Sequence, residues 1–112
     1  MPPLRRPLSP TALHILAAIA DGPRHGYAIK QEVEARVPGV VRLGPGTLYE
    51  AIQRLLDAQL VRETAGEAEP ANGQQAQRRY YELTGRGRKV LQDEVEHWRR
   101  FVDYAKRRLE PA

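Results

Sequence analysis

The sequence contains no cysteine, and its longest mainly apolar run, residues 12–20, is too short to cross a bilayer. Without cysteine the chain has no disulfide, no thiolate zinc site and no cysteine nucleophile. It also has no HExxH motif and no glycine loop that would cradle a phosphate, and no acid, base and nucleophile stand in a recognisable arrangement. We therefore expect no metal site, no cofactor and no enzymatic activity.

The size and charge of the chain point to one small basic domain. At 112 residues it can bury a core without help from a metal or a disulfide. Charged residues make up 29% of the sequence, and the formal net charge is +4 with a sequence pI of about 9.8. This balance suits a polyanionic partner such as nucleic acid. No signal peptide or membrane span is visible, so we expect a cytoplasmic protein that does not bind membranes.

The most informative stretch is residues 43–61, LGPGTLYEAIQRLLDAQLV. Gly44 and Pro45 are suited to the cap and the first position of a helix. Leucine or isoleucine then recurs at positions 48, 52, 55 and 56, which gathers these side chains on one helical face. The opposite face carries Thr47, Tyr49, Gln53 and Arg54, whose polar groups can read base edges. An ordinary solvated amphipathic helix has the same pattern, so this stretch alone leaves both interpretations open.

The chain begins with two shorter segments. Residues 1–7 contain three prolines and two arginines, which predicts an extended, mobile arm. Ser9 and Pro10 then supply a cap and a first-turn proline for a helix over residues 11–20. Its inward positions are predicted to be Leu13, Leu16 and Ile19.

A second helix is predicted over residues 25–37, with Tyr27, Ile29 and Val33 turned to the core. Pro38 and Gly39 should end this helix. A short connection, residues 39–44, joins it to the helix that starts at residue 45. Two helices joined this tightly are typical of a helix-turn-helix unit.

After residue 59 the pattern changes from helix to strand. Residues 60–64 alternate apolar and charged side chains, and residues 79–84 supply tyrosines and a leucine for a second strand. We expect the two strands to pair as a hairpin. Their connection, residues 65–77, is polar and longer than most hairpin loops, which predicts a long flexible wing.

The last segment, residues 85–109, is uninterrupted and favours helix. Apolar residues stand at positions 91, 95, 98, 102, 105 and 109, with alternating spacings of four and three, as in a coiled-coil seam. Phe101 and Tyr104 widen this stripe beyond what a small helical core can cover. A helix that packs back on its own domain is the alternative. A partner chain is the simpler explanation, because it can cover the whole width of the stripe.

The order of three helices, a two-stranded wing and a long helix is that of a winged helix followed by a dimerisation helix. The sequence resembles the PadR-like transcriptional regulators in three motifs: HGY at residues 25–27, GTLY with RL over residues 46–55, and RYYELT at residues 79–84 before Gly87. The short chain with its single C-terminal helix is similar to the compact subfamily. The resemblance implies a winged-helix domain over residues 1–84 and a dimerisation helix over residues 85–112.

The resemblance further implies a homodimer whose third helices enter successive major grooves of a two-fold symmetric operator in double-stranded DNA, while the wings follow the backbone. The matching positions are Thr47, Tyr49, Gln53 and Arg54 on the third helix, with Arg78, Arg79 and Tyr80 at the base of the wing. Arginine pairs well with guanine and glutamine with adenine, which agrees with these roles. Each residue also has a structural interpretation: Arg54 can pair with Glu50, and Tyr49 can pack on the wing.

Trp98 is the candidate effector-binding residue. Multidrug-responsive relatives carry a tryptophan eighteen residues after the first tyrosine of the Tyr-Tyr pair, and the same count from Tyr80 gives Trp98. A small planar aromatic or apolar ligand would stack there, with Phe101 as a neighbouring wall. The alternative is that Trp98 only packs the dimer.

The sequence thus predicts a mainly helical protein with a small β-hairpin, a winged helix-turn-helix and a long C-terminal helix. Its expected function is that of a homodimeric, sequence-specific DNA-binding regulator, most simply a repressor relieved by a small effector. The rival prediction is a winged-helix module that binds a protein and has weak or lost DNA binding.

Overall fold

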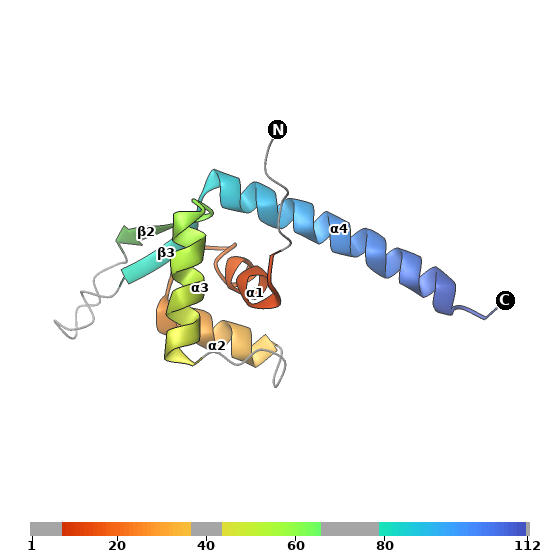
Figure 1. The fold of residues 1–112 in the computed structure, drawn as a ribbon, viewed down its shortest axis with the longest axis horizontal. Coiled ribbons are helices and arrows are strands. Elements are labelled where there is room, and N and C mark those ends of the chain that lie inside the picture. Colours follow the sequence, from red (N-terminus) through yellow and green to blue (C-terminus); the bar gives the residue numbers. More distant parts are fainter. Residues whose placement is uncertain (1–7, 37–43, 66–78, 112) are drawn as a thin grey trace.

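The computed structural model describes residues 8–36, 44–65 and 79–111. These residues form four helices and three strands, in the order α1 (Pro10–Ala18), β1 (Arg24–His25), α2 (Gly26–Arg36), α3 (Pro45–Asp57), β2 (Val61–Ala65), β3 (Arg79–Leu83) and α4 (Gly85–Leu109) (Figure 1). The predicted fold class is confirmed. Three predicted features lie outside the described residues: the arm over residues 1–7, the end of the second helix at residues 38–39, and all of the wing loop predicted over residues 65–77 except Ala65, which ends β2. Within the described ranges, no helix is long and apolar enough to cross a membrane.

Helix α1 begins at the predicted cap. The Ser9 hydroxyl accepts a hydrogen bond from the Ala12 backbone N–H at 3.1 Å, and Pro10 stands in the first turn. Its buried face differs in part from the prediction, because Ile15 is completely buried whereas Leu13 is only half-buried. The face that meets the core runs through positions 15, 16, 18 and 19, which leaves Leu13 at its margin.

The sheet has the order β1-β3-β2, with both pairs antiparallel. The predicted hairpin is confirmed, with a register that runs from Val61 opposite Leu83 to Ala65 opposite Arg79. Strand β1 was not predicted. Its two residues, Arg24 and His25, pair with Tyr81 and Tyr80 of β3, and a two-residue strand is too short to show a periodicity. As a result His25 lies in a strand and not in the second helix, which begins at Gly26.

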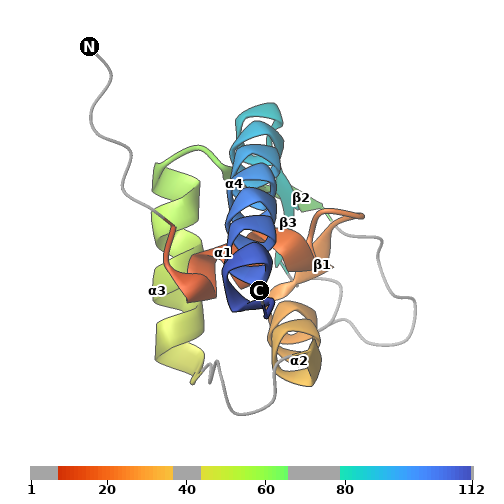
Figure 2. The same ribbon diagram turned by 90° about the vertical axis from the view of Figure 1, so that its right-hand side faces the viewer.

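The core lies between the first three helices and the sheet. Helix α1 contacts each of the other three helices and occupies the middle of the molecule (Figure 2). The largest completely buried side chains come from α1, α2 and α3: Ile15, Leu16, Ile19, Ile29, Val33 and Ile52. Burial of each such side chain stabilises the fold by about 1.5–3 kcal/mol, so this cluster is the main source of stability.

Helix α4 starts beside the end of α3 and then leaves the domain (Figure 1). Thr84 caps its first turn, and Val90 and Leu91 pack against the core. Its later turns project away, which gives the molecule extents of 63 × 38 × 24 Å. The hairpin and the far end of α4 consequently lie at opposite ends of the molecule.

Candidate nucleic-acid interface

Helix α3 separates an apolar face from a polar face as predicted. Leu48, Ile52 and Leu55 are buried, and Leu56 lies half-buried at the edge of the core. The four predicted contact residues, Thr47, Tyr49, Gln53 and Arg54, are all exposed. The thirteen-residue helix is about 20 Å long, which fits a major groove.

Gln53 and Arg54 differ in the contacts that they make along α3. The Gln53 amide donates a hydrogen bond to the Asp57 carboxylate at 3.0 Å, an exposed contact that a base edge can replace. Glu50 and Arg54 are both exposed, and the described part of the chain contains no ion pair between them. The predicted structural role of Arg54 is therefore not seen, and its contact with a base stays a prediction.

The N-terminus of α3 is open. Its cap is Gly44, which has no side chain to bond the N–H groups of the first turn, and the first backbone bond is from Leu48 N to Gly44 O at 3.0 Å. Among the described residues, a side-chain carbon at Gly46 would meet nothing within 4 Å. A helix start without a side-chain cap favours a phosphate oxygen, because its N–H groups and the helix dipole both attract an anion.

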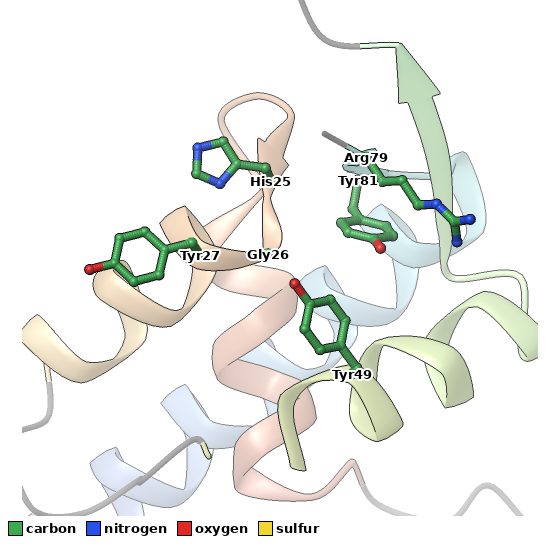
Figure 3. A pocket seen from close by; sticks show the side chains of 6 residues that line it. All are labelled: His25, Gly26, Tyr27, Tyr49, Arg79 and Tyr81. Atoms are coloured by element: carbon green, nitrogen blue, oxygen red, sulfur yellow. The ribbon is translucent and has the colours of Figure 1, made fainter. Parts of the chain in front are cut away.

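Tyr49 reaches from α3 across to the start of α2. A Cβ atom at Gly26 would lie 2.9 Å from the Tyr49 hydroxyl oxygen and 3.2 Å from its ring, so glycine at this position lets Tyr49 approach the backbone closely. Figure 3 shows the hydroxyl directed toward Gly26 and Tyr81. Tyr49 therefore lies at the junction of α2, α3 and β3.

An open cavity of about 410 Å³ lies at this junction. Its lining residues come from β1, from the start of α2, from α3 and from β3: His25, Gly26, Tyr27, Tyr49, Arg79 and Tyr81 (Figure 3). Of the six predicted contact residues that the structure describes, Tyr49 and Arg79 line it. Thr47, Gln53 and Arg54 lie elsewhere on α3.

Tyr27 is a correction to the sequence prediction, which placed it in the core. The residue is 57% exposed, because the buried face of α2 runs through Gly26, Ile29 and Val33 and turns position 27 outward. Its ring stands beside the cavity with its hydroxyl directed away from the domain (Figure 3). A tyrosine in an apolar pattern usually packs in the core, so the sequence alone does not show that position 27 faces outward.

His25 was also missed, and its role is local. Its ring Nδ1 accepts a hydrogen bond from the Ala28 backbone N–H at 3.1 Å, which caps the start of α2. The same ring meets the Tyr80 ring edge to face, with centroids 5.4 Å apart. Because α2 begins one residue later, a histidine directly before a glycine at a helix start was the available signal for a cap.

The base of the wing holds Arg79 at the edge and two tyrosines behind it. The exposed Arg79 guanidinium lies 3.5 Å from the Glu63 carboxylate, and Tyr80 is half-buried against His25. Tyr81 is buried, and this burial, with smaller contributions from Glu63 and Tyr49, raises the pKa of its hydroxyl. Arg78, the remaining predicted contact, lies outside the described residues.

The predicted effector residues lie on the part of α4 that projects from the domain. Trp98 and Phe101 are 47% and 52% exposed, with their rings edge to face at 5.8 Å. The indole N–H donates a hydrogen bond to the Glu94 carboxylate at 3.2 Å. Val95, Val102 and Leu109 are exposed along the same helix. Within the described ranges, no three His, Asp or Glu side chains are grouped to hold a metal ion.

Comparison with known proteins identifies the chain's relatives. An uncharacterised 37.1 kDa protein of a Streptomyces fradiae transposon is 43% identical over 81 residues, which is 72% of this chain but only 21% of that protein. A PadR-like transcription factor from Bacteroides fragilis is 26% identical in structure-based alignment, with a TM-score of 0.68 and 86% of each chain covered. A PadR-like transcriptional regulator from Bacillus cereus shares the fold at 20% identity, with a TM-score of 0.73 and coverage of 90% of this chain and 92% of that one.

The match to a family is the most direct of these findings. The model described as "Transcriptional regulator PadR-like family" matches residues 15–93, from within α1 to the first half of α4. This range contains the polar face of α3, the cavity at the start of α2 and the base of the wing. The chain therefore belongs to the PadR-like family of transcriptional regulators.

Proposed function

We propose that the chain is a homodimeric, sequence-specific DNA-binding repressor that acts in the bacterial cytoplasm. The observation that carries the proposal is the exposed polar face of α3, which adjoins an open helix N-terminus and the Arg79 edge of the wing. Membership in a family of transcriptional regulators supports it and makes an enzyme the wrong class of protein. The net charge of +4 favours an anionic partner.

Within this proposal the contacts divide into two kinds. Gln53 and Arg54 read base edges, because an amide and a guanidinium can each form two hydrogen bonds with one base. Thr47, Tyr49, Arg79 and Tyr80, with Arg78, hold the phosphate backbone and fix the register of α3. Tyr27 joins this second group, since it is exposed and its ring lies beside the cavity that Tyr49 and Arg79 line.

The second chain of the dimer covers the apolar face of α4. Val95, Trp98, Val102 and Leu109 are between 46% and 82% exposed, which is a large apolar surface for one helix to leave in water. In this proposal residues 1–84 bind DNA and residues 85–112 dimerise, as the sequence predicted. Two identical helices related by a two-fold axis bury the same patch on each chain.

A small planar effector relieves repression by entering between the two α4 helices at Trp98 and Phe101. For a five- to 150-fold effect on DNA affinity, it must prefer the spread dimer over the DNA-bound one by about 1–3 kcal/mol. As the only tryptophan of the chain, Trp98 is its own reporter. Planar dyes should quench its fluorescence, and Trp98→Phe, measured by the fluorescence of the dye, or Phe101→Ala should weaken dye binding while DNA binding persists. Dye affinity equal to wild type in Phe101→Ala would leave these rings as dimer packing.

Salt-dependent binding to duplex DNA tests the DNA-binding part of the proposal. The full chain is used to select bound sequences from a random duplex pool, and the affinity for the enriched duplex is measured between about 50 and 200 mM salt. Two chains that contact roughly six to ten phosphates should lose about a thousandfold or more in affinity. A selection without enrichment and a flat salt dependence would favour the rival, a winged-helix module that binds a protein.

A reporter gene tests the sign of regulation. The enriched sequence is placed over a bacterial promoter, where the wild-type chain should lower transcription. The Arg54→Ala variant serves as the control, because its weaker binding should restore part of the transcription. Higher transcription with the wild-type chain would make it an activator.

A further inference from the structure

The end of α3 and the beginning of α4 are fastened to each other through Thr84. Its backbone N–H donates a hydrogen bond to the Leu60 carbonyl at 3.1 Å, and its hydroxyl donates one to the Gln59 carbonyl at 2.7 Å. The same hydroxyl accepts a hydrogen bond from the Gly87 N–H at 2.9 Å. One side chain thus caps α4 and binds the turn that follows α3.

The α3 side of this junction has an unusual backbone. Gln59 has a φ of +63°, the one positive φ of a non-glycine residue in the described ranges. Two hydrogen bonds close the helix end there: Leu60 N donates to Leu55 O and Gln59 N donates to Leu56 O, both at 3.0 Å. This pattern is a Schellman motif, which normally uses glycine at the left-handed position. The motif orders the two carbonyl groups that Thr84 binds.

Gly87 allows α4 to lie directly on that turn. The residue is buried, and a Cβ atom there would overlap the Leu60 carbonyl oxygen and lie 2.8 Å from its carbonyl carbon. Backbone atoms cannot rotate away as the end of a long side chain can. At Gly85, by contrast, a Cβ atom would meet nothing within 4 Å. Glycine is therefore needed at position 87 for a close approach, and position 85 tolerates a side chain.

A hydrogen bond and an apolar contact with the domain also fix the direction of α4 among the residues that the structure describes. The Arg88 guanidinium donates a hydrogen bond to the Ala20 carbonyl after α1 at 3.0 Å, and Val90 and Leu91 pack on the core. From Val95 onward the apolar side chains are exposed. Helix α4 has 25 residues and is about 37 Å long, so a 10° change at its start moves its far end by roughly 6 Å.

We propose that Thr84 and Gly87 are positioning residues for DNA recognition, which set the separation of the two operator half-sites that the dimer accepts. The inference rests on the proposed dimeric DNA-binding function. The two α4 helices pair with each other, and each is fastened to its own α3 at this junction, so the junction sets the distance and angle between the recognition helices. One additional base pair moves a half-site by about 3.4 Å and rotates it by roughly 34°, so small changes at the junction alter the preferred separation.

A series of duplexes with different half-site separations tests the inference. The wild-type chain is used to select half-sites from a random pool, and duplexes are built in which their separation grows one base pair at a time. Wild type should prefer one separation and lose about tenfold in affinity two base pairs away from it. Thr84→Val, which keeps the shape but removes the hydroxyl, should reduce this preference to about threefold or less. Affinity for a single half-site should change by less than about twofold.

Three further variants complete the design. Thr84→Ser restores a hydroxyl and should restore the wild-type preference. Gly85→Ala is the matched control for Gly87→Ala, since only the second places a Cβ atom against the Leu60 carbonyl. Gly87→Ala should shift the preferred separation. If circular dichroism shows that this variant does not fold, the result with Thr84→Val decides whether the junction has the positioning role.

The outcomes separate this inference from the proposed function. A wild-type chain that enriches no sequence contradicts the proposed function. A wild-type chain with a preferred separation that Thr84→Val shares in full overturns the positioning role. An equal loss of affinity at every separation would also overturn it, because a merely destabilised protein behaves in that way.

Discussion

Helices α3 and α4 carry the same kind of apolar stripe and differ in what covers it. On α3 the side chains of Leu48, Ile52 and Leu55 are 2–4% exposed, whereas on α4 those of Val95, Trp98 and Val102 are 46–58% exposed. The stripe of α3 meets α1 and the sheet within the same chain. The stripe of α4 extends past the domain. Periodicity therefore predicts which face of a helix is apolar, but the length of the helix relative to its domain decides whether the chain itself can cover it.

The polar faces of the two helices differ in the groups that they expose. On α4 the charges are paired within the helix: Arg99 contacts Glu96 at 2.6 Å and Asp103 at 3.2 Å, and Lys89 contacts Asp93 at 2.7 Å. On α3 the exposed side chains include hydroxyls, an amide and a guanidinium beside an uncapped N-terminus. Surface ion pairs such as those of α4 add little stability, and Lys106, Arg107 and Arg108 in its last turn stand outside these pairs. The two helices therefore differ in the kind of polar group that they expose, and the exposed apolar stripe is the feature of α4 that favours a second chain.

The largest expected effect is on the α4 side of the comparison. Replacing Val95 and Val102 together with Glu places four like charges in one dimer interface, which should cost several kcal/mol of association free energy. Sedimentation at micromolar concentration should then show a single chain. Gln92→Glu with His97→Glu, which adds the same charge to other exposed positions of α4, is the control and should remain dimeric. A dimer in the Val95 and Val102 variant would mean that another surface associates.

The next effect compares the two stripes within a single chain. In the Val95→Glu and Val102→Glu background, Ile52→Ala should lower the free energy of unfolding by about 2–5 kcal/mol, because it opens a cavity in a closed core. Phe101→Ala in the same background should change it by less than about 0.5 kcal/mol, since the ring is already in water. Urea unfolding measures both. Similar losses in the two variants would show that the stripe of α4 is covered within the chain.

The sequence was sufficient for the elements with long, regular patterns. Local spacing, which the sequence displays directly, predicted the cap at Ser9, the two faces of α3 and the length of α4. It also predicted the hairpin, with strands at residues 60–64 and 79–84 that the structure places at Val61–Ala65 and Arg79–Leu83. Membership in the family and the fold class followed from the same residues.

The sequence was insufficient where one backbone contact or a two-residue element decides the structure. Strand β1 is too short for a pattern, and its pairing with β3 moved His25 out of α2. Tyr27 was placed in the core because an aromatic side chain in an apolar series usually packs, yet Gly26 takes the inward position. The positive φ of Gln59 was not predictable, because glycine normally marks that conformation.

The third expected effect distinguishes contacts with base edges, made by α3, from contacts with the phosphate backbone, made by Arg79. Gln53→Ala or Arg54→Ala should weaken binding to the selected operator by about 1–3 kcal/mol and relax specificity at one position per half-site. Arg79→Ala should weaken operator and random DNA about equally, because a phosphate contact carries no sequence information. Fluorescence anisotropy with both duplexes measures the difference. Equal losses on both duplexes for the two helix variants would contradict base reading by α3.

The smallest expected effect tests whether the Tyr81 hydroxyl, which lies beside α3, is buried away from water. Burial raises the pKa of this hydroxyl above its ordinary value of 10.0, so the folded state favours the neutral form. Its contribution to stability is therefore complete below pH 10.0 and is lost as pH rises through the raised pKa. Tyr81→Phe should lose less stability on alkaline titration than wild type, whereas Tyr80→Phe serves as the neighbouring control. Parallel titration curves for wild type and Tyr81→Phe would mean that the site is open to water.

The mass of the full chain in solution, with and without its selected duplex, tests the central claim that α4 binds a second chain while α3 binds DNA. Sedimentation equilibrium should give twice the 12.7 kDa chain mass alone and two chains per duplex in the complex. A single chain in both conditions would contradict the account.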